Sequence, residues 1–187
     1  MTPQELAGLA QIAKLDATAR QQLLVELYKL VRKHLAMMLG SAADCEDAVQ
    51  ESMIAIHRAL PTFRGEANPK TWALTIATRV GSKIRRKAGR YVPTENVGID
   101  IASPFSNPAD LAALQRGLAT LVPKKRDAFV LMEIFELSAK EAAQVLGTFA
   151  NTAASRHRHA RDELQTYFSS GKFDESGLVA ATKVGHG

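Results

Sequence analysis

Apolar side chains recur every three or four residues along most of the chain, which is the spacing expected on one face of an α-helix. In the first half this pattern predicts one helix from about residue 20 to Gly40, and two more over residues 44–60 and 71–88. Pro61 ends the second of these helices, because a proline inside a helix removes a hydrogen bond and clashes with the preceding turn. Residues 1–19 are interpreted as an N-terminal helical extension.

The helical pattern resumes at about Ala109, where it predicts a helix ending before Pro123, another over 124–136 and two more up to residue 168. Between the halves, residues 89–108 contain three prolines and two glycines without any helical period, which indicates a linker. Residues 169–187 are interpreted as a disordered tail. The expected fold is all-α, with two small helical domains, 20–88 and 109–168, joined by a flexible linker.

The composition limits which partners and which cellular compartment we expect for the protein. A formal net charge of +5 fits a nucleic-acid partner or an acidic surface. The one cysteine, Cys45, cannot form an internal disulfide, which favours a reducing compartment. No apolar run approaches the ~18 residues that a membrane span needs, and the N-terminus lacks the pattern of a signal peptide. We therefore expect a cytoplasmic protein without membrane insertion.

Patterns of enzyme chemistry are missing from the sequence. It contains neither a phosphate-binding P-loop nor a glycine-rich dinucleotide fingerprint. Cys45 lies among acidic residues, which raise the pKa of a thiol and make it a poor nucleophile. His157 and His159 are two positions apart on a predicted helix, so they point in different directions and cannot easily share a metal. We expect no catalytic activity, no cofactor and no bound metal.

The segment around residue 147 has the pattern of a helix-turn-helix. Ser138 and Glu141 form a capping box at the start of its first helix, and Gly147 supplies the positive φ of a tight turn. Thr148 is the expected cap of the second helix. Polar side chains that can contact base edges and phosphates follow on that helix: Asn151, Thr152, Ser155, Arg156, Arg158 and Arg161. The alternative is a pair of packed surface helices with solvated arginines.

Acidic residues share one face of the predicted helix over 44–60. Asp44, Asp47 and Glu51 have the spacing of neighbours on a helix surface, with Glu46 and Gln50 beside them. Three interpretations are open: a solvated helix start, a magnesium site, and a docking surface for a partner protein. Docking would also require apolar anchors, for which Val49 and Met53 are the candidates.

The helix over 71–88 carries a basic stripe, formed by Arg79, Lys83 and Arg86, and Arg90 continues the stripe if the helix extends that far. Trp72 lies on nearly the same face, where it could stack on a base or simply belong to the core. The loop before this helix adds three polar side chains: Arg64, Asn68 and Lys70. Nucleic-acid binding and a merely solvated basic face are both compatible with this pattern.

The order and the residues of these motifs resemble those of the extracytoplasmic-function group of bacterial sigma factors. The resemblance rests on the sequences DCEDAVQE (44–51), FRGE (63–66), TWALTIA (71–77) and LSAKEAAQVLG (137–147), followed by Ser155 and Arg156. It implies core RNA polymerase and promoter DNA as partners, an anti-sigma factor as a candidate third partner, and transcription initiation in response to stress or an envelope signal. The implied polymerase-binding residues are Asp44, Glu46, Asp47, Val49, Gln50 and Glu51. The implied minus-10 DNA-binding residues are Arg64, Asn68, Lys70, Trp72, Arg79, Lys83 and Arg86. The minus-35 residues would be the six on the second helix of the helix-turn-helix.

The chain departs from the family pattern at several positions. Arg79 stands where the family often has Asn, and Lys83 where it often has Asp. Ala150, Ala154 and His157 replace an acidic residue, a lysine and a leucine, and Glu136 replaces a glycine before the Leu137–Ser138 pair. Two other functions are weighed against a sigma factor. One is a repressor or activator that uses only the helix-turn-helix, and the other is a magnesium-dependent nuclease that uses the acidic helix.

The linker limits how the two predicted domains can reach DNA. About 20 residues stretch to at most ~70 Å but average only ~25 Å as a coil. Two promoter elements about two helical turns apart are separated by ~70 Å. We therefore expect the domains to span much of that distance themselves. In the free protein we expect them to be independent, unless an inhibitor or mutual packing holds them together.

Overall fold

The computed structural model describes the chain except for residues 1, 14–15, 40, 66, 89–107 and 171–187. The N-terminal domain contains α1 (Pro3–Ile12), α2 (Ala17–Leu39), α3 (Ala42–Ala59), the 3-10 turn η1 (Leu60–Thr62) and α4 (Pro69–Ala88). The C-terminal domain contains α5 (Pro108–Thr120), α6 (Pro123–Phe129), the π-helical turn η2 (Val130–Ile134), α7 (Ala139–Leu146) and α8 (Ala150–Ser169). Helices are the only regular structure in the part of the chain that is described, which confirms the all-α fold.

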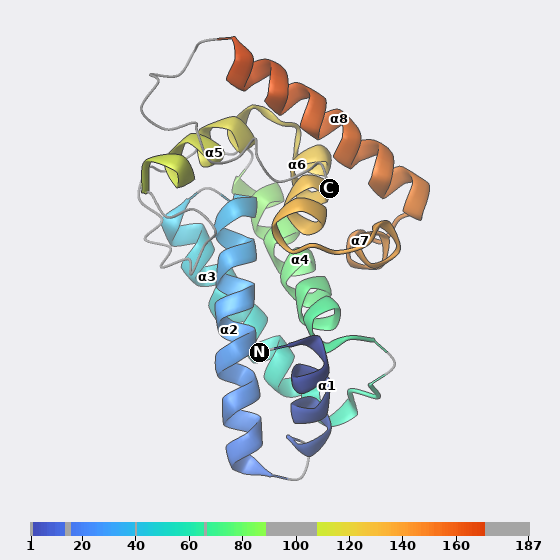
Figure 1. Ribbon diagram of the computed structural model, residues 1–187. Coiled ribbons are helices and arrows are strands. Elements are labelled where there is room, and N and C mark those ends of the chain that lie inside the picture. Colours follow the sequence, from blue (N-terminus) through green and yellow to red (C-terminus); the bar gives the residue numbers. More distant parts are fainter. Residues whose placement is uncertain (1, 14–15, 40, 66, 89–107, 171–187) are drawn as a thin grey trace.

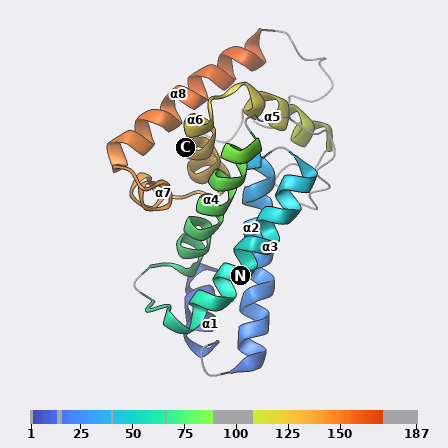
Figure 2. The same cartoon turned by 180° about the vertical axis from the view of Figure 1, so that it is seen from behind.

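The N-terminal domain is a bundle in which α2, α3 and α4 run side by side (Figures 1 and 2). Leu23, Leu27 and Val31 on α2 are fully buried in its core. Gly81 allows α4 to approach α2 closely, because a Cβ there would lie 2.8 Å from Leu35 Cδ2. The short helix α1 packs against α2 and α4 at one end of this bundle.

The C-terminal domain is organised around α6 and α8. α8 crosses the end of the molecule opposite α1, and α7 lies alongside α4 (Figure 1). The guanidinium of Arg126 is buried, and it donates hydrogen bonds to the carbonyl oxygens of Leu118 at 2.7 Å and Leu121 at 2.9 Å. These bonds satisfy carbonyls at the C-terminal end of α5, where a helix has no partners of its own.

The two domains pack against each other. Met37 and Leu74 belong to the N-terminal domain, yet both are fully buried in the hydrophobic cluster of the C-terminal domain. Arg85 on α4 makes a bidentate ion pair with Asp127 on α6, at 2.9 and 2.8 Å. The structure therefore corresponds to the exception named above, in which mutual packing holds the domains together.

The helix boundaries differ from the expected ones in ways that have simple causes. Pro61 lies within η1 rather than just after a helix end, because proline is compatible with the first positions of a helical turn. The helix expected over 124–136 is divided into α6 and η2. The predicted flexible linker, apart from Pro108, and the predicted tail beyond Ser170 lie outside the described residues.

Candidate functional surfaces

The first helix of the predicted helix-turn-helix begins at a complete capping box. The amide of Glu141 donates to Ser138 Oγ at 3.3 Å, and the amide of Ser138 donates to Glu141 Oε2 at 2.9 Å. Hydrogen bonds from the Ser138 hydroxyl and amide hold the pKa of the Glu141 carboxyl below its usual value. Gly147 ends α7 with φ of 61°, in the left-handed region that favours glycine. Both predictions are confirmed.

The cap of the second helix differs from the prediction. Thr148 is not the N-cap of α8; that position is occupied by Phe149, whose side chain makes no capping hydrogen bond. The amide of Thr148 instead donates to the Ala143 carbonyl oxygen at 3.0 Å, which closes the turn after α7. The left-handed glycine thus places the start of α8 one residue later than the sequence suggested.

α8 has one buried face and one exposed face. Ala153, Ala160 and Leu164 face the core, and of the six predicted DNA-binding residues Asn151, Arg158 and Arg161 are exposed. The other three, Thr152, Ser155 and Arg156, are half-buried along the flanks. The structure therefore places the six residues on one helix, but only half of them on its most exposed face.

His157 occupies a position where the family has an apolar residue. Its ring stacks on Phe129 with centroids 6.0 Å apart, and its Nε2 lies 2.8 Å from Glu133 Oε2. The imidazole thus packs one face on the core while a polar atom finds a partner at the edge. This pairing explains how a histidine is accommodated there without a change of helix register.

The acidic face of α3 is exposed as the spacing predicts. Glu46, Asp47, Gln50 and Glu51 are exposed, whereas Asp44 is half-buried in the first turn, where its amide donates to the Ser41 hydroxyl. Two of these carboxylates have basic partners: Glu51 lies 2.8 Å from Lys83 and Glu46 lies 3.5 Å from Arg32. The face is therefore acidic at its centre, with basic side chains along both edges.

Val49 does not project from this surface. Its side chain is 2% exposed and belongs to the core of the N-terminal domain, because the face of α3 that it occupies is covered by α2. Val49 therefore offers little exposed area to a partner, and its role as a docking anchor stays a prediction. The exposed large hydrophobic side chain on α3 is Ile54, at a position that the sequence analysis did not single out.

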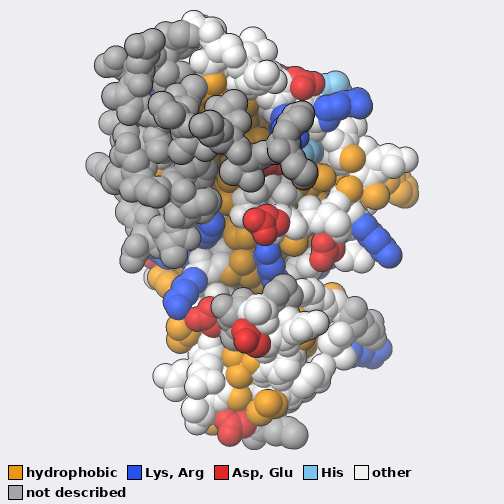
Figure 3. All heavy atoms as spheres, in the orientation of Figure 1, with side chains coloured by type: hydrophobic (Ala, Val, Ile, Leu, Met, Phe, Trp, Pro, Cys, Tyr) orange, Lys and Arg blue, Asp and Glu red, His pale blue; other side chains and the backbone are white. Residues whose placement is uncertain are grey.

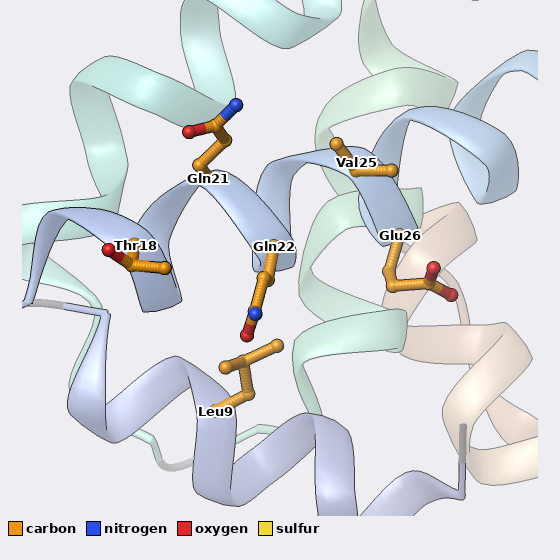
Figure 4. A pocket seen from close by; sticks show the side chains of 6 residues that line it. All are labelled: Leu9, Thr18, Gln21, Gln22, Val25 and Glu26. Carbon is orange, nitrogen blue, oxygen red and sulfur yellow. The ribbon is translucent and has the colours of Figure 1, made fainter.

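A groove with mainly apolar walls runs between α2 and α3, next to the acidic face. Leu24, Val25 and Tyr28 line it from α2, Val49 and Met53 from α3. A second groove lies between α1 and α2, where Leu9 faces Gln22 (Figure 4). Val25 is 49% exposed and lines both grooves, so it is an exposed apolar side chain that the two grooves share.

The loop before α4 is held by contacts that the sequence did not reveal. Trp72 packs on Phe63 with ring centroids 4.8 Å apart, and it is partly buried against the core. The Asn68 side-chain oxygen accepts from the amide of Lys70 at 2.9 Å and so caps α4. Gly65 has φ of 77°, and α1 lies so close that a Cβ there would be 2.3 Å from Gln11 Nε2.

Lys70 connects the two domains instead of facing solvent. Its ammonium donates to the Phe135 carbonyl oxygen at 2.5 Å and lies 6.0 Å from the Phe135 ring centroid. Burial lowers the pKa of Lys70, although Glu136 and Glu141 partly oppose that effect. In this arrangement Lys70 is engaged within the protein.

The basic stripe of α4 is partly confirmed. Arg79, Lys83 and Arg86 are exposed, and Arg90 lies outside the described residues. Arg85, which was not part of the predicted stripe, points towards the C-terminal domain and pairs with Asp127. One flank of α4 therefore presents positive charge to solvent, while the neighbouring flank contributes to the contact between domains.

Comparisons with known proteins match both domains to one family. Residues 23–91 match the model of sigma-70 region 2, and residues 111–164 match that of sigma-70, region 4. The sigma-E factor of Salmonella typhimurium, an extracytoplasmic-function (ECF) RNA polymerase sigma factor, is 30% identical over 158 residues, which cover 76% of this chain and 83% of the relative. This chain belongs to the extracytoplasmic-function sigma factors. As a member of that family, it directs core RNA polymerase to promoters and initiates transcription.

Other relatives agree with this assignment. The ECF sigma factor SigM of Mycobacterium tuberculosis is 28% identical over 151 residues, covering 80% of this sigma factor and 76% of the relative. Two solved structures share its fold. CnrH in complex with the cytosolic domain of CnrY has a TM-score of 0.67 at 23% identity, covering 88% of this chain and 97% of that one. The sigma factor RpoE of Bartonella quintana, in complex with the anti-sigma factor NepR, has a TM-score of 0.68 at 22% identity, covering 81% and 98%.

Cysteine chemistry and metal binding add no second site in the part of the sigma factor that the structure describes. Cys45 is buried, and its thiol pKa is raised to about 11, first by burial and second by Glu46. Burial is thus a larger cause than the acidic neighbours on which the sequence argument relied. Within the described ranges, His, Cys, Asp and Glu side chains form no group of three or more that could hold a metal ion. None of the described helices is long and apolar enough to cross a membrane.

Proposed function

We propose a division of labour between the two domains of this sigma factor. Residues 20–88 dock on core RNA polymerase and engage the minus-10 element, and residues 109–168 read the minus-35 element through α8. The observation that carries this proposal is the sorting of charge between neighbouring helices. α3 exposes carboxylates for a protein partner, whereas α4 and α8 expose arginines and lysines for DNA.

Polymerase docking uses the acidic face of α3 together with the groove beside it. Asp47, Gln50 and Glu51 supply charge and hydrogen-bonding groups, which accelerate association and fix the register of the complex. Affinity comes from apolar contact, and Val25, Tyr28 and Ile54 are the exposed side chains that can provide it. Val49 supports this surface from beneath, and Asp44 lies in the first turn of the helix that carries it.

The minus-10 element is opened on the exposed flank of α4. Arg79, Lys83 and Arg86 neutralise backbone phosphates there, and Arg64 lies in the loop where an unstacked base would be received. Asn68 and Trp72 position that loop, since one caps α4 and the other packs on Phe63. Lys70 joins this set only after it leaves the carbonyl oxygen of Phe135.

Initiation requires the packed domains to separate. Two elements ~70 Å apart cannot both be reached while α7 lies against α4. Polymerase and promoter DNA must therefore bind an open form more tightly than the closed one, since a ligand shifts an equilibrium only by its differential affinity. An anti-sigma factor that favours the closed form is the corresponding negative regulator, and it would connect transcription to stress or an envelope signal.

The protein itself catalyses nothing in this proposal, because the polymerase forms the phosphodiester bonds. It acts in the cytoplasm, where core polymerase and DNA are found. A repressor or activator using α7 and α8 alone would bind DNA without core polymerase. Stable binding to purified core polymerase separates these two functions.

The test is transcription from a genomic promoter library by core polymerase with and without this protein. We expect new start sites that share two upstream sequence elements. Replacing Asp47 and Glu51 by Lys should weaken core binding without unfolding α3, because exposed substitutions usually change stability by within about 0.5 kcal/mol. Reversing the exposed Asp162 and Glu163 on α8 to Lys is the matched control, because it makes the same change of charge and also breaks one ion pair, that of Glu163 with Lys125. Transcription that is the same with and without the protein contradicts the proposal.

The two DNA roles are separated with templates that are already melted. Replacing Arg79, Lys83 and Arg86 by Ala should impair initiation on duplex DNA and be partly rescued by a bubble at the minus-10 element, because the unstacking cost has been removed. Arg158→Ala on α8 should not be rescued to the same degree. Equal rescue of both variants in run-off transcription would show that the assignment of roles is wrong.

A further inference from the structure

Phe149 is the most exposed of the large hydrophobic side chains in the described part of the chain, at 82%. It belongs to neither of the two hydrophobic clusters found among the described residues. Its backbone is extended, with φ of −90° and ψ of 151°, and it occupies the N-cap of α8. Phenylalanine thus stands at a position where Ser, Thr, Asp or Asn would stabilise the helix by accepting a hydrogen bond.

The surrounding turn fixes the backbone that carries this side chain. Gly147 is left-handed, and the amide of Thr148 donates to the Ala143 carbonyl oxygen at 3.0 Å, so the backbone immediately before Phe149 is fixed. The next residue, Ala150, and the residue one turn further, Ala154, are both exposed and small. The helix surface that follows Phe149 therefore carries little side-chain bulk at these two positions.

The corner formed by α7 and the start of α8 projects from the molecule away from α3 (Figures 1 and 2). Hydrophobic side chains gather on that corner in the space-filling view (Figure 3). The acidic face and the grooves beside α2 lie on other elements. An exposed aromatic ring at this corner is therefore remote from the proposed polymerase-docking surface.

The chemistry of the major groove identifies a ligand for such a ring. The N-terminal residues of a recognition helix are those that meet base edges. Among the four bases, only thymine presents an apolar group there, its C5 methyl, and phenylalanine is one of the side chains that contact it. Arg158 and Arg161, further along α8, are exposed and available to phosphates.

We propose that Phe149 is a specificity-determining residue that packs against the C5 methyl group of a thymine in the minus-35 element. This inference rests on the proposed function, in which α8 reads that element in duplex DNA. Hydrogen-bonding side chains of α8 then distinguish bases by donors and acceptors, while Phe149 distinguishes thymine by shape and apolar contact. The lost N-cap hydrogen bond and the exposed ring are explained together by this contact.

The test replaces one methyl group at a time. Holoenzyme formed from core polymerase and the full chain is bound to a promoter taken from the library, and each minus-35 thymine is replaced by deoxyuridine, which lacks only the C5 methyl. At one thymine we expect about a fourfold loss of affinity, the value for one buried methyl-sized group. Phe149→Ala should cause a similar loss on thymine DNA and should abolish the sensitivity to deoxyuridine. Phe149→Leu should keep part of it.

Val122→Ala is the matched control, because Val122 is also an exposed apolar N-cap without a side-chain hydrogen bond in the same domain. It should leave the sensitivity to deoxyuridine unchanged. Deoxyuridine sensitivity that persists in Phe149→Ala, or a minus-35 element without thymine, overturns the inference while the proposed function stands. If Phe149→Ala weakens binding to core polymerase in the absence of DNA as much as it weakens binding of the holoenzyme to the promoter, the ring makes a protein contact and the inference is also overturned. Affinity that does not depend on the minus-35 sequence at all refutes the proposed function itself.

Discussion

The ion pair between Arg85 and Asp127 is the contact between the domains whose removal we expect to matter most. Its two hydrogen bonds measure 2.9 and 2.8 Å, and the side chains are only 15% and 6% exposed. Removing one partner of a buried pair is strongly destabilising, because the other charge is left without compensation in a poorly solvated site. The opened protein allows the remaining charge to be hydrated, so the penalty falls on the closed form.

The magnitude follows from that difference. Removal of one partner of a fully buried pair costs about 3–5 kcal/mol, and we reduce this to about 2 kcal/mol because neither side chain is completely removed from water. This corresponds to about a 30-fold shift of the equilibrium towards the open form. If about 99% of the wild-type molecules are closed, only about three quarters of Arg85→Ala molecules would remain closed.

The assay measures the distance between the domains in the full chain. Fluorescent donor and acceptor groups are attached to cysteines introduced at the exposed positions Arg58 on α3 and Gln165 on α8. Cys45 can remain, since its thiol is buried and its pKa is raised to about 11. Arg85→Ala and Asp127→Asn should each add a population with longer distances. Asp127→Asn should also increase core polymerase affinity, by at most the same factor.

The exposed pair between Lys83 and Glu51 provides the control for this experiment. Its separation is 2.8 Å, but its side chains are 52% and 45% exposed and both lie in the N-terminal domain. Lys83→Ala should leave the distance distribution unchanged. If Arg85→Ala and Asp127→Asn also leave it unchanged, then the ion pair does not contribute measurably to closure and the reasoning about its burial is refuted.

Two further predictions concern single residues at or near the contact between domains. Burial lowers the pKa of His34 from 6.5 to about 4; Asp127 opposes this shift and Arg85 reinforces it. Between these two pH values the unfolded chain binds more protons than the folded protein. The free energy of unfolding must therefore fall as pH decreases from 6.5 towards 4. Urea unfolding should show that the wild-type protein loses about 2 kcal/mol more stability between pH 7.5 and pH 5 than His34→Gln does. His34→Gln is the control because glutamine retains a donor for Thr78. Equal pH dependence in both proteins contradicts a neutral buried imidazole. Glu136 has φ of 54°, so Glu136→Gly should relieve backbone strain and stabilise the protein by about 0.5 kcal/mol after the entropy of the unfolded glycine is subtracted. The same change at the exposed helical residue Gln144 should instead destabilise it by about 1 kcal/mol, and a lower urea midpoint for Glu136→Gly would argue against strain at that position.

Features determined by nearby residues could be predicted from the sequence. The capping box of Ser138 and Glu141 and the left-handed Gly147 depend on a few neighbouring positions, and both were predicted correctly. Glu136 belongs to the same class, because the family pattern places a glycine there and the structure shows a positive φ. Local pattern failed at Thr148, since the turn displaced the cap by one residue to Phe149.

Features determined by distant residues could not be predicted in this way. Periodicity places Val49 on α3, but only the packing of α2 decides that this side chain is buried. Lys70 contacts a carbonyl oxygen 65 residues away and Arg85 contacts a carboxylate 42 residues away. A basic residue next to a DNA-binding stripe looks the same in sequence whether it meets a phosphate or an aspartate. The sequence could therefore identify the charged surfaces, but not which of their side chains are paired within the protein in the closed form.

The need to open for polymerase binding limits how stable the closed form can be. The apparent affinity for polymerase is the intrinsic affinity reduced by the fraction of open molecules. A closed form favoured by about 3 kcal/mol reduces it about 150-fold, which strong docking could offset, whereas one favoured by about 8 kcal/mol would reduce it nearly a millionfold. Because Lys70 and Arg85 contribute to closure from the helix that also carries the minus-10 residues, promoter DNA that attracts α4 competes directly with those contacts. Promoter DNA can compete for these two basic side chains but not for Met37 and Leu74, so the cost of separating the apolar part of the contact must be offset by polymerase docking.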